Sequence, residues 1–214
     1  MKKTTVAIMT GISMITMAQP ALAATIDGEG SADVEINGTI GKLDNTDPGE
    51  IIPEGTDEWI NVVVDTATAF HTTTASGHKS IESADYQIEN KSGRGVQVSL
   101  GAIQGEPKLV NVLSINGTVN GNTAIAPTPR DLVVNNSLTD LSNSGAWMTL
   151  GNKEGRLNIA TDEANAFGNT ATFNYTGETI ADLPTDINEA TTAENYTLTL
   201  KFKSIQADGV TVGV

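Results

Sequence analysis

Apolar and polar residues alternate along several short stretches of the chain, a pattern typical of strands that bury one face. Residues 196–202, YTLTLKF, alternate in this way and place Lys201 and Lys203 on the polar face if Phe202 points inward. Residues 59–65, WINVVVD, carry a continuous apolar run, which predicts a strand buried on both faces. The strictest alternation lies between residues 31 and 40, where one face holds Ala32, Val34, Ile36 and Ile40 and the other Asp33, Glu35, Asn37 and Thr39.

Turn signals between these runs recur at the spacing of a β-sandwich, and we count roughly nine to eleven short strands. The sequence therefore predicts an all-β fold, an antiparallel β-sandwich of the jelly-roll kind. Residues placed on the inward faces form the predicted core: Ile60, Val62, Val64, Tyr86, Ile88, Val96, Val98, Leu100, Leu198, Leu200 and Phe202.

Two local hairpins are predicted from turn residues. Strands at 85–89 and 96–100 flank the turn-forming segment 90–95, NKSGRG. The Asn116–Gly117 pair lies between apolar residues 109–115 and 118–119, and Asn-Gly is a strong signal for a two-residue hairpin turn.

The first 23 residues have the three parts of a secretory signal peptide. Lys2 and Lys3 precede an apolar core, Pro20 ends it, and Ala21–Ala23 supplies the small-x-small site. Cleavage is expected before Ala24, so that the mass spectrum of the exported protein should begin there. We expect residues 24–214 to form a single secreted β-sandwich domain, extracellular and at the cell surface, with no membrane insertion after cleavage.

Composition limits the function classes. The net charge is −14, and it becomes two units more negative when Lys2 and Lys3 are removed, so the surface is expected to repel nucleic acid. Cysteine is absent, which excludes thiol catalysis, thiolate zinc sites and iron–sulfur clusters. We therefore expect no cofactor.

Residues 41–57 are rich in Asp, Glu, Gly and Pro and predict an irregular acidic loop, mobile and dispensable for folding. Within it, residues 44–50 bring several hard oxygen ligands together but do not match an EF-hand loop. A solvated turn is the favoured interpretation, with bound calcium as the open alternative.

Catalytic patterns are weak. His71 and His78 lie in one Thr- and Ser-rich segment without a nucleophile motif such as G-x-S-x-G or a third convergent group. A carboxylate pair is not singled out among the many acids. The chain is therefore expected not to be an enzyme, and an extracellular enzyme ranks third among the functions considered.

Four runs together carry a resemblance: VEINGTIG, WINVVVDT, YQIENKSGRGVQVSL and YTLTLKF. In layout the chain resembles the WxL-domain secreted surface proteins of low-GC Gram-positive bacteria. Of the distal family pattern, Tyr196 and Leu200 match, whereas Phe202 stands in the place of a tryptophan. The resemblance implies a β-rich protein held non-covalently on peptidoglycan.

These observations predict a non-catalytic cell-surface protein that associates non-covalently with wall peptidoglycan or other surface proteins, as in adhesion. Trp59 and Trp147 are the candidate contact residues, provided that either is exposed. The alternative is a pilin-type fibre subunit and homo-oligomer, in which residues 32–40 serve as a donor strand for the next subunit. Pairing of residues 32–40 within their own domain is the simpler expectation.

Overall fold

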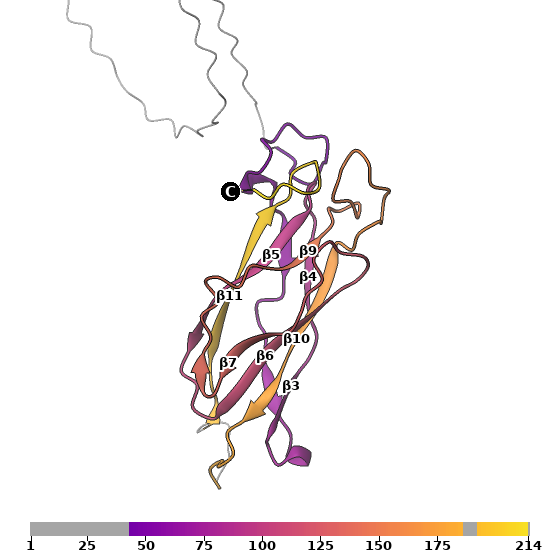
Figure 1. Ribbon diagram of the computed structural model, residues 1–214. Coiled ribbons are helices and arrows are strands. Elements are labelled where there is room, and N and C mark those ends of the chain that lie inside the picture. Colours follow the sequence, from indigo (N-terminus) through magenta and orange to yellow (C-terminus); the bar gives the residue numbers. More distant parts are fainter. Residues whose placement is uncertain (1–42, 186–191, 214) are drawn as a thin grey trace, which may run out of the picture. The chain divides into compact units, whose positions relative to one another are not determined.

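The computed structural model describes residues 43–185 and 192–213 (Figure 1). Predicted cleavage before Ala24 and the predicted strand at 31–40 lie outside the described residues. Residues 42–214 belong to one compact unit. Among the described residues, we find no helix that has both the length and the apolar character needed to cross a membrane.

The regular secondary structure of the described residues is almost entirely β-strand, which confirms the predicted all-β sandwich-like fold. Two short 3-10 helices, η1 (Asp57–Trp59) and η2 (Thr74–Ser76), interrupt the strands. The strands are β1 (Val62–Val64), β2 (Phe70–Thr72), β3 (Ser80–Ser83), β4 (Tyr86–Asn90), β5 (Val96–Gly105), β6 (Val110–Val119), β7 (Arg130–Val134), β8 (Ser137–Leu138), β9 (Ala146–Leu150), β10 (Thr170–Thr179) and β11 (Tyr196–Ser204).

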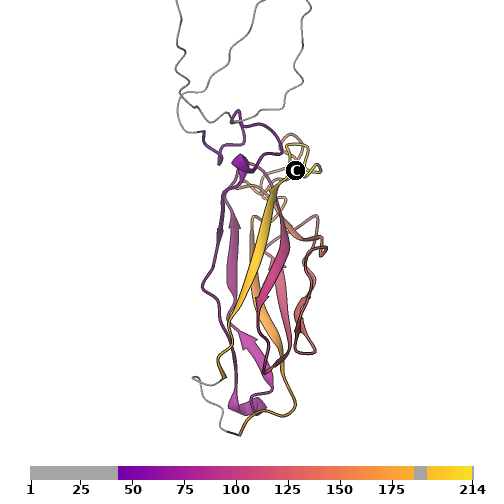
Figure 2. The same cartoon turned by 90° about the vertical axis from the view of Figure 1, so that its left-hand side faces the viewer.

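All strand pairs are antiparallel, and they form two sheets. The larger sheet has the order β1-β4-β10-β6-β7-β8, with β3 pairing β10 and β2 pairing β3. The smaller sheet has the order β11-β5-β9, so β5 is its centre, and among the described residues no strand pairs with the other edge of β11. In Figure 2, β11 faces the viewer.

The core lies between the two sheets. Of the predicted core residues, Ile88, Val96, Val98 and Leu100 are buried. Six others are only half-buried but pack against the core: Val62, Val64, Tyr86, Leu198, Leu200 and Phe202. Ile60 is half-buried and lies outside this cluster. The alternation of β11 is confirmed, because Lys201 and Lys203 are exposed on the opposite face from Phe202.

Leu100 and Leu200 are direct register partners on β5 and β11, yet only Leu100 is buried, with 2% of its surface exposed. We therefore expect Leu100→Ala to lower the free energy of unfolding by about 2–5 kcal/mol, the usual result of truncating a buried leucine. Leu200→Ala should lower it by only about 1 kcal/mol, because the half-buried side chain loses less apolar burial. Urea unfolding of both variants tests this; equal losses would mean that β11 is as deeply buried as β5.

The predicted hairpin across residues 90–95 is wrong. β4 pairs β1 and β10 in the larger sheet, whereas β5 pairs β11 and β9 in the smaller one. The connecting segment therefore crosses between sheets, and it is held by buried polar groups. The side-chain amide of Asn90 donates hydrogen bonds to the carbonyls of Arg94 and Gly151, at 2.9 and 2.8 Å.

The predicted Asn116–Gly117 turn is also wrong, because β6 continues through it from Val110 to Val119. Gly117 pairs with Phe173 of β10 inside the sheet. A Cβ atom at Gly117 would lie 2.8 Å from Cζ2 of Trp147. Glycine is thus explained by the space that the Trp147 ring occupies rather than by a turn.

Residues 43–57 follow an irregular path, as predicted, but tertiary contacts hold them to the sandwich. The side-chain amide of Asn61 donates to the Asn45 side-chain oxygen at 3.0 Å, and the Gly93 amide donates to the Asn45 carbonyl at 2.7 Å. Ile52 is 5% exposed. These contacts oppose the expectation of a mobile loop, and whether the loop is dispensable for folding stays a prediction.

Candidate functional site

An apolar groove of about 1150 Å³ lies between the two sheets of the described structure. One wall is the inner face of β11, which presents Tyr196, Leu198, Leu200 and Phe202. The other wall runs from Val64 through β2. Side chains from β5, β6, β7 and β10 lie between the walls: Ile103, Val110, Leu113, Leu132, Phe173 and Tyr175.

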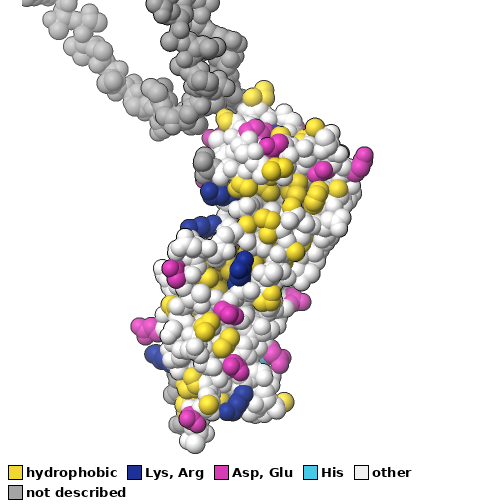
Figure 3. All heavy atoms as spheres, in the orientation of Figure 1, with side chains coloured by type: hydrophobic (Ala, Val, Ile, Leu, Met, Phe, Trp, Pro, Cys, Tyr) yellow, Lys and Arg dark blue, Asp and Glu magenta, His cyan; other side chains and the backbone are white. Residues whose placement is uncertain are grey.

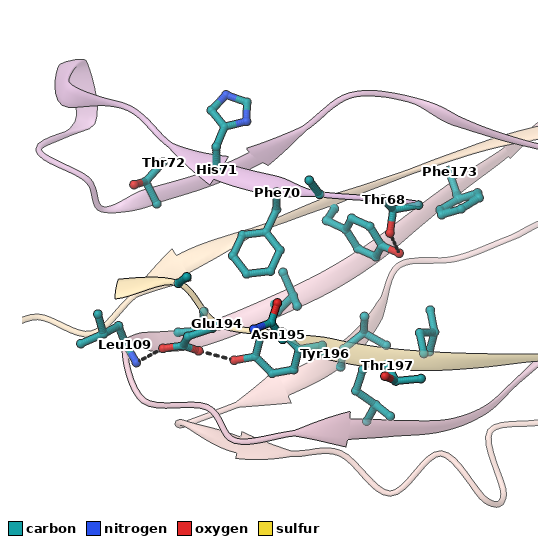
Figure 4. A pocket seen from close by; sticks show the side chains of 18 of the residues that line it. Thr68, Phe70, His71, Thr72, Leu109, Phe173, Glu194, Asn195, Tyr196 and Thr197 are labelled. Carbon is teal, nitrogen blue, oxygen red and sulfur yellow. Dashed lines mark hydrogen bonds between the residues drawn. The ribbon is translucent and has the colours of Figure 1, made fainter. Parts of the chain in front are cut away.

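The groove exists because the sandwich is open along one side. The inner side chains of β11 alternate with exposed residues, yet each stays only half-buried. Phe70 of β2 and Tyr196 of β11 face each other across the opening, with ring centroids 6.1 Å apart (Figure 4). Within the part of the chain that the structure describes, β11 is the last strand of its sheet, so an edge without a paired strand also lies beside this opening.

Polar groups close one end of the groove. The Glu194 carboxylate accepts hydrogen bonds from the backbone amide of Leu109 and from the Tyr196 phenol (Figure 4). It also accepts from the backbone amide of Lys108. Deeper in, the hydroxyls of Thr68 and Tyr175 are hydrogen-bonded at 3.2 Å. These contacts fix the start of β11 and leave the apolar side chains of Leu198, Leu200 and Phe202 facing the groove.

Burial, followed by the hydrogen bond and charge of Glu194, raises the pKa of the Tyr196 phenol above its ordinary value. Burial also raises the pKa of Tyr175. Below about pH 10 both phenols stay protonated in the folded and unfolded chains, so their shifts do not affect stability. Above about pH 10 the unfolded chain loses protons that the folded chain retains, and the free energy of unfolding falls.

We expect Tyr196→Phe to flatten this alkaline decline between about pH 10 and pH 12, because it removes one of the groups responsible. Urea unfolding at several pH values measures the slope. An unchanged slope in Tyr196→Phe would mean that the phenol ionises equally in both states.

The two histidines lie close together in the chain, His71 in β2 and His78 just after η2. His71 is exposed and points away from the groove (Figure 4). His78 contacts the Thr72 hydroxyl through Nδ1 at 3.0 Å. In the residues that the structure describes, we find no group of three or more His, Asp or Glu side chains placed to hold a metal ion.

In the acidic loop, carboxylates accept hydrogen bonds from the loop itself. Asp44 accepts from the amide and hydroxyl of Thr46, Asp47 from the amide of Gly49, and Glu50 from the amides of Asp44 and Ile51. Such side-chain-to-backbone bonds are typical of turns, which fits the favoured interpretation of residues 44–50.

The candidate contact residues, Trp59 and Trp147, are 0% and 1% exposed. Trp147 also donates an indole hydrogen bond to the Thr128 carbonyl at 3.0 Å. Neither offers the exposed aromatic surface on which its candidacy depends, because each ring buries a large apolar area in the fold. Their assignment as contact residues is corrected to a structural role.

Charged side chains are scattered over the face shown in Figure 3, where acidic and basic groups intermix rather than form a basic stripe. The outer face of β11 is locally basic. Its exposed side chains are those of Lys201 and Lys203 together with two threonines. Among the ion pairs formed within the described residues, none involves either lysine.

No family model, curated protein or solved structure matches this chain. The groove is therefore interpreted from its own geometry. Sequence reasoning placed β11, its inward apolar residues and its outward lysines, but not the groove. The one sequence signal for the groove was that the alternation begins at Tyr196, two residues after the carboxylate of Glu194.

Proposed function

We propose that this protein is a non-catalytic, secreted cell-surface protein that holds an extended segment of a protein partner along the free edge of β11. The observation that carries the proposal is the apolar groove beside an unpaired strand edge. A strand added there would satisfy backbone groups through hydrogen bonds, while alternate side chains would enter the groove.

The chemistry of the groove favours a polypeptide over a wall glycan. Its inner walls are formed largely by aliphatic and aromatic side chains, and both tryptophans that sugar rings could have stacked on are buried. The surface location is supported by the signal-peptide pattern and by the resemblance to WxL-domain proteins. Other surface proteins are accordingly the partners proposed, ahead of peptidoglycan itself.

The test uses the exported chain and an uncharged ten-residue peptide in which valine and threonine alternate. We expect binding by fluorescence anisotropy and slower hydrogen exchange at the amides of β11 when peptide is present. Leu198→Asn, which places an amide on the inner face, should weaken binding at least tenfold, since it opposes apolar burial. Lys203→Asn introduces the same residue on the outer face and should leave binding unchanged.

Absence of peptide binding, or equal weakening by both asparagine variants, would contradict the proposal. Co-sedimentation with purified peptidoglycan at low and high salt tests the wall directly. Wall binding that survives Leu198→Asn would show that the protein uses another surface.

A further inference from the structure

We propose that the strand taken up by this groove is residues 31–40 of a second copy of the chain, aligned antiparallel to β11. The inference rests on the proposed function and names its partner. It is drawn from the alternation of residues 31–40, the charge on the outer face of β11, and the place where the described chain begins.

Charge complementarity favours this pairing. A strand that adds to an edge shares faces with its neighbour, so its apolar residues enter the groove and its polar residues join the outer face. The outer face of β11 ends in Lys201 and Lys203, and neither takes part in an ion pair among the described residues. The polar face of residues 31–40 carries Asp33 and Glu35. The two faces are complementary in charge.

The register between residues 31–40 and β11 is also favourable. With Glu35 opposite Lys201, an antiparallel alignment also brings Asp33 opposite Lys203, so both opposite-charge pairs form together. The same alignment places every inner residue of the incoming strand opposite an inner residue of β11: Val34 opposite Phe202, Ile36 opposite Leu200, Gly38 opposite Leu198 and Ile40 opposite Tyr196. One register thus satisfies the charges and places apolar side chains opposite Phe202, Leu200 and Tyr196.

A parallel alignment either pairs the charges or provides partners along the whole inner face of β11, but it does not do both. With Ile36 opposite Leu200, the carboxylates of Asp33 and Glu35 face Thr197 and Thr199 instead of the lysines. Sliding the strand until Glu35 meets Lys203 puts Ile36 opposite Ser204, and Leu198 and Tyr196 lose their partners. The antiparallel register is therefore preferred.

The position of the first described residues shows whether the antiparallel strand can belong to the same copy of the chain. Asn45 contacts Asn61, just before β1, and the carbonyl of Thr56 accepts from the hydroxyl of Ser204 at 3.1 Å. The described chain thus begins near the Ser204 end of β11. The antiparallel register needs Ile40 at the Tyr196 end, about 25–30 Å away for a nine-residue strand.

Only residues 41–44 connect Ile40 to Asn45, and the five steps between those two residues span at most about 18 Å. A chain folding back onto its own β11 would therefore run parallel to it. The antiparallel strand must come from another copy. Because donor segment and acceptor groove are different surfaces, such contacts are heterologous and propagate into open fibres or close into rings.

The absence of cysteine makes the register directly testable. We would mix exported chains carrying Glu35→Cys with chains carrying Lys201→Cys and oxidise them. Residues directly opposite in antiparallel strands have Cα atoms about 4.5–5.5 Å apart, within the range that a disulfide bridges. We expect a disulfide between the two chains. Glu35→Cys mixed with Thr199→Cys is the matched control, because it reports the groove-filling parallel register.

A second experiment reverses the charges. Lys201→Glu with Lys203→Glu should weaken self-association about tenfold in analytical ultracentrifugation, since like charges then face each other. Adding Asp33→Lys with Glu35→Lys should restore it. A simple folding defect would not be rescued by the second pair of changes.

Several outcomes would overturn the inference. A disulfide formed within one monomer of the Glu35→Cys, Thr199→Cys double variant would place residues 31–40 on their own β11. A chain that binds the uncharged peptide but remains monomeric and uncrosslinked would identify another protein as the partner, and the proposed function would stand. A chain that neither binds the peptide nor associates would contradict both proposals.

Discussion

Arg94→Ala should lower the free energy of unfolding by about 2–4 kcal/mol, because it removes charge-assisted hydrogen bonds to the partly exposed Glu54 carboxylate and the packing of a buried guanidinium on Trp59. Arg94 is 5% exposed, and its Nε donates to both Glu54 carboxylate oxygens at 3.0 and 3.1 Å. Its Nη1 donates to the Pro48 carbonyl at 2.8 Å, and its guanidinium lies 4.0 Å from the ring centroid of Trp59. One side chain therefore joins residues 48–59 to the sandwich.

Lys91→Ala is the matched control, because Lys91 pairs with Glu89 on the exposed surface at 3.4 Å. We expect a loss of no more than about 1 kcal/mol there, the range for exposed pairs. Urea unfolding gives both values, and limited proteolysis should show earlier cleavage within 43–57 only in Arg94→Ala. If Arg94→Ala unfolds like Lys91→Ala, the loop contributes nothing to stability and the sequence expectation was right.

Trp147→Ala should be comparably severe, with a loss of about 3–5 kcal/mol. The ring is 1% exposed, packs over the backbone of Gly117, and its indole nitrogen donates to the Thr128 carbonyl. Truncation leaves a cavity between β9 and β6 and removes the partner of a carbonyl.

Val210→Ala removes an apolar side chain that is 80% exposed and should change stability by less than about 0.5 kcal/mol. Chemical unfolding of the two variants separates the core from the surface. A small loss for Trp147→Ala would mean that the buried ring contributes little to the stability of the core.

Alternation identified the fold class because side-chain period is a local property of a strand. It correctly placed Val96, Val98 and Leu100 inside and Lys201 and Lys203 outside. Pairing is not local, and there the sequence misled. Asn116–Gly117 has the composition of a turn, yet the Trp147 ring 30 residues later requires a residue without a side chain.

The candidate site could not be predicted for the same reason. A groove depends on which strand lies at the edge of a sheet, and the edge position of β11 follows from pairing with β5, about 100 residues earlier. The sequence predicts that Leu198 and Leu200 point inward, but it does not show that the opposite wall of the groove is separated from them. It likewise marks residues 43–57 as polar without revealing that Arg94 is their partner.

The order of the smaller sheet has a kinetic consequence. β5 is its central strand, and both of its partners, β9 and β11, are synthesised after it. The C-terminal strand completes that sheet, and the Glu54 carboxylate accepts from the amide of Ala207, 153 residues away. Such non-local pairing makes folding slow, in the range of milliseconds to seconds. A chain emerging from its N-terminus therefore cannot assemble the full sandwich until nearly all of it is available.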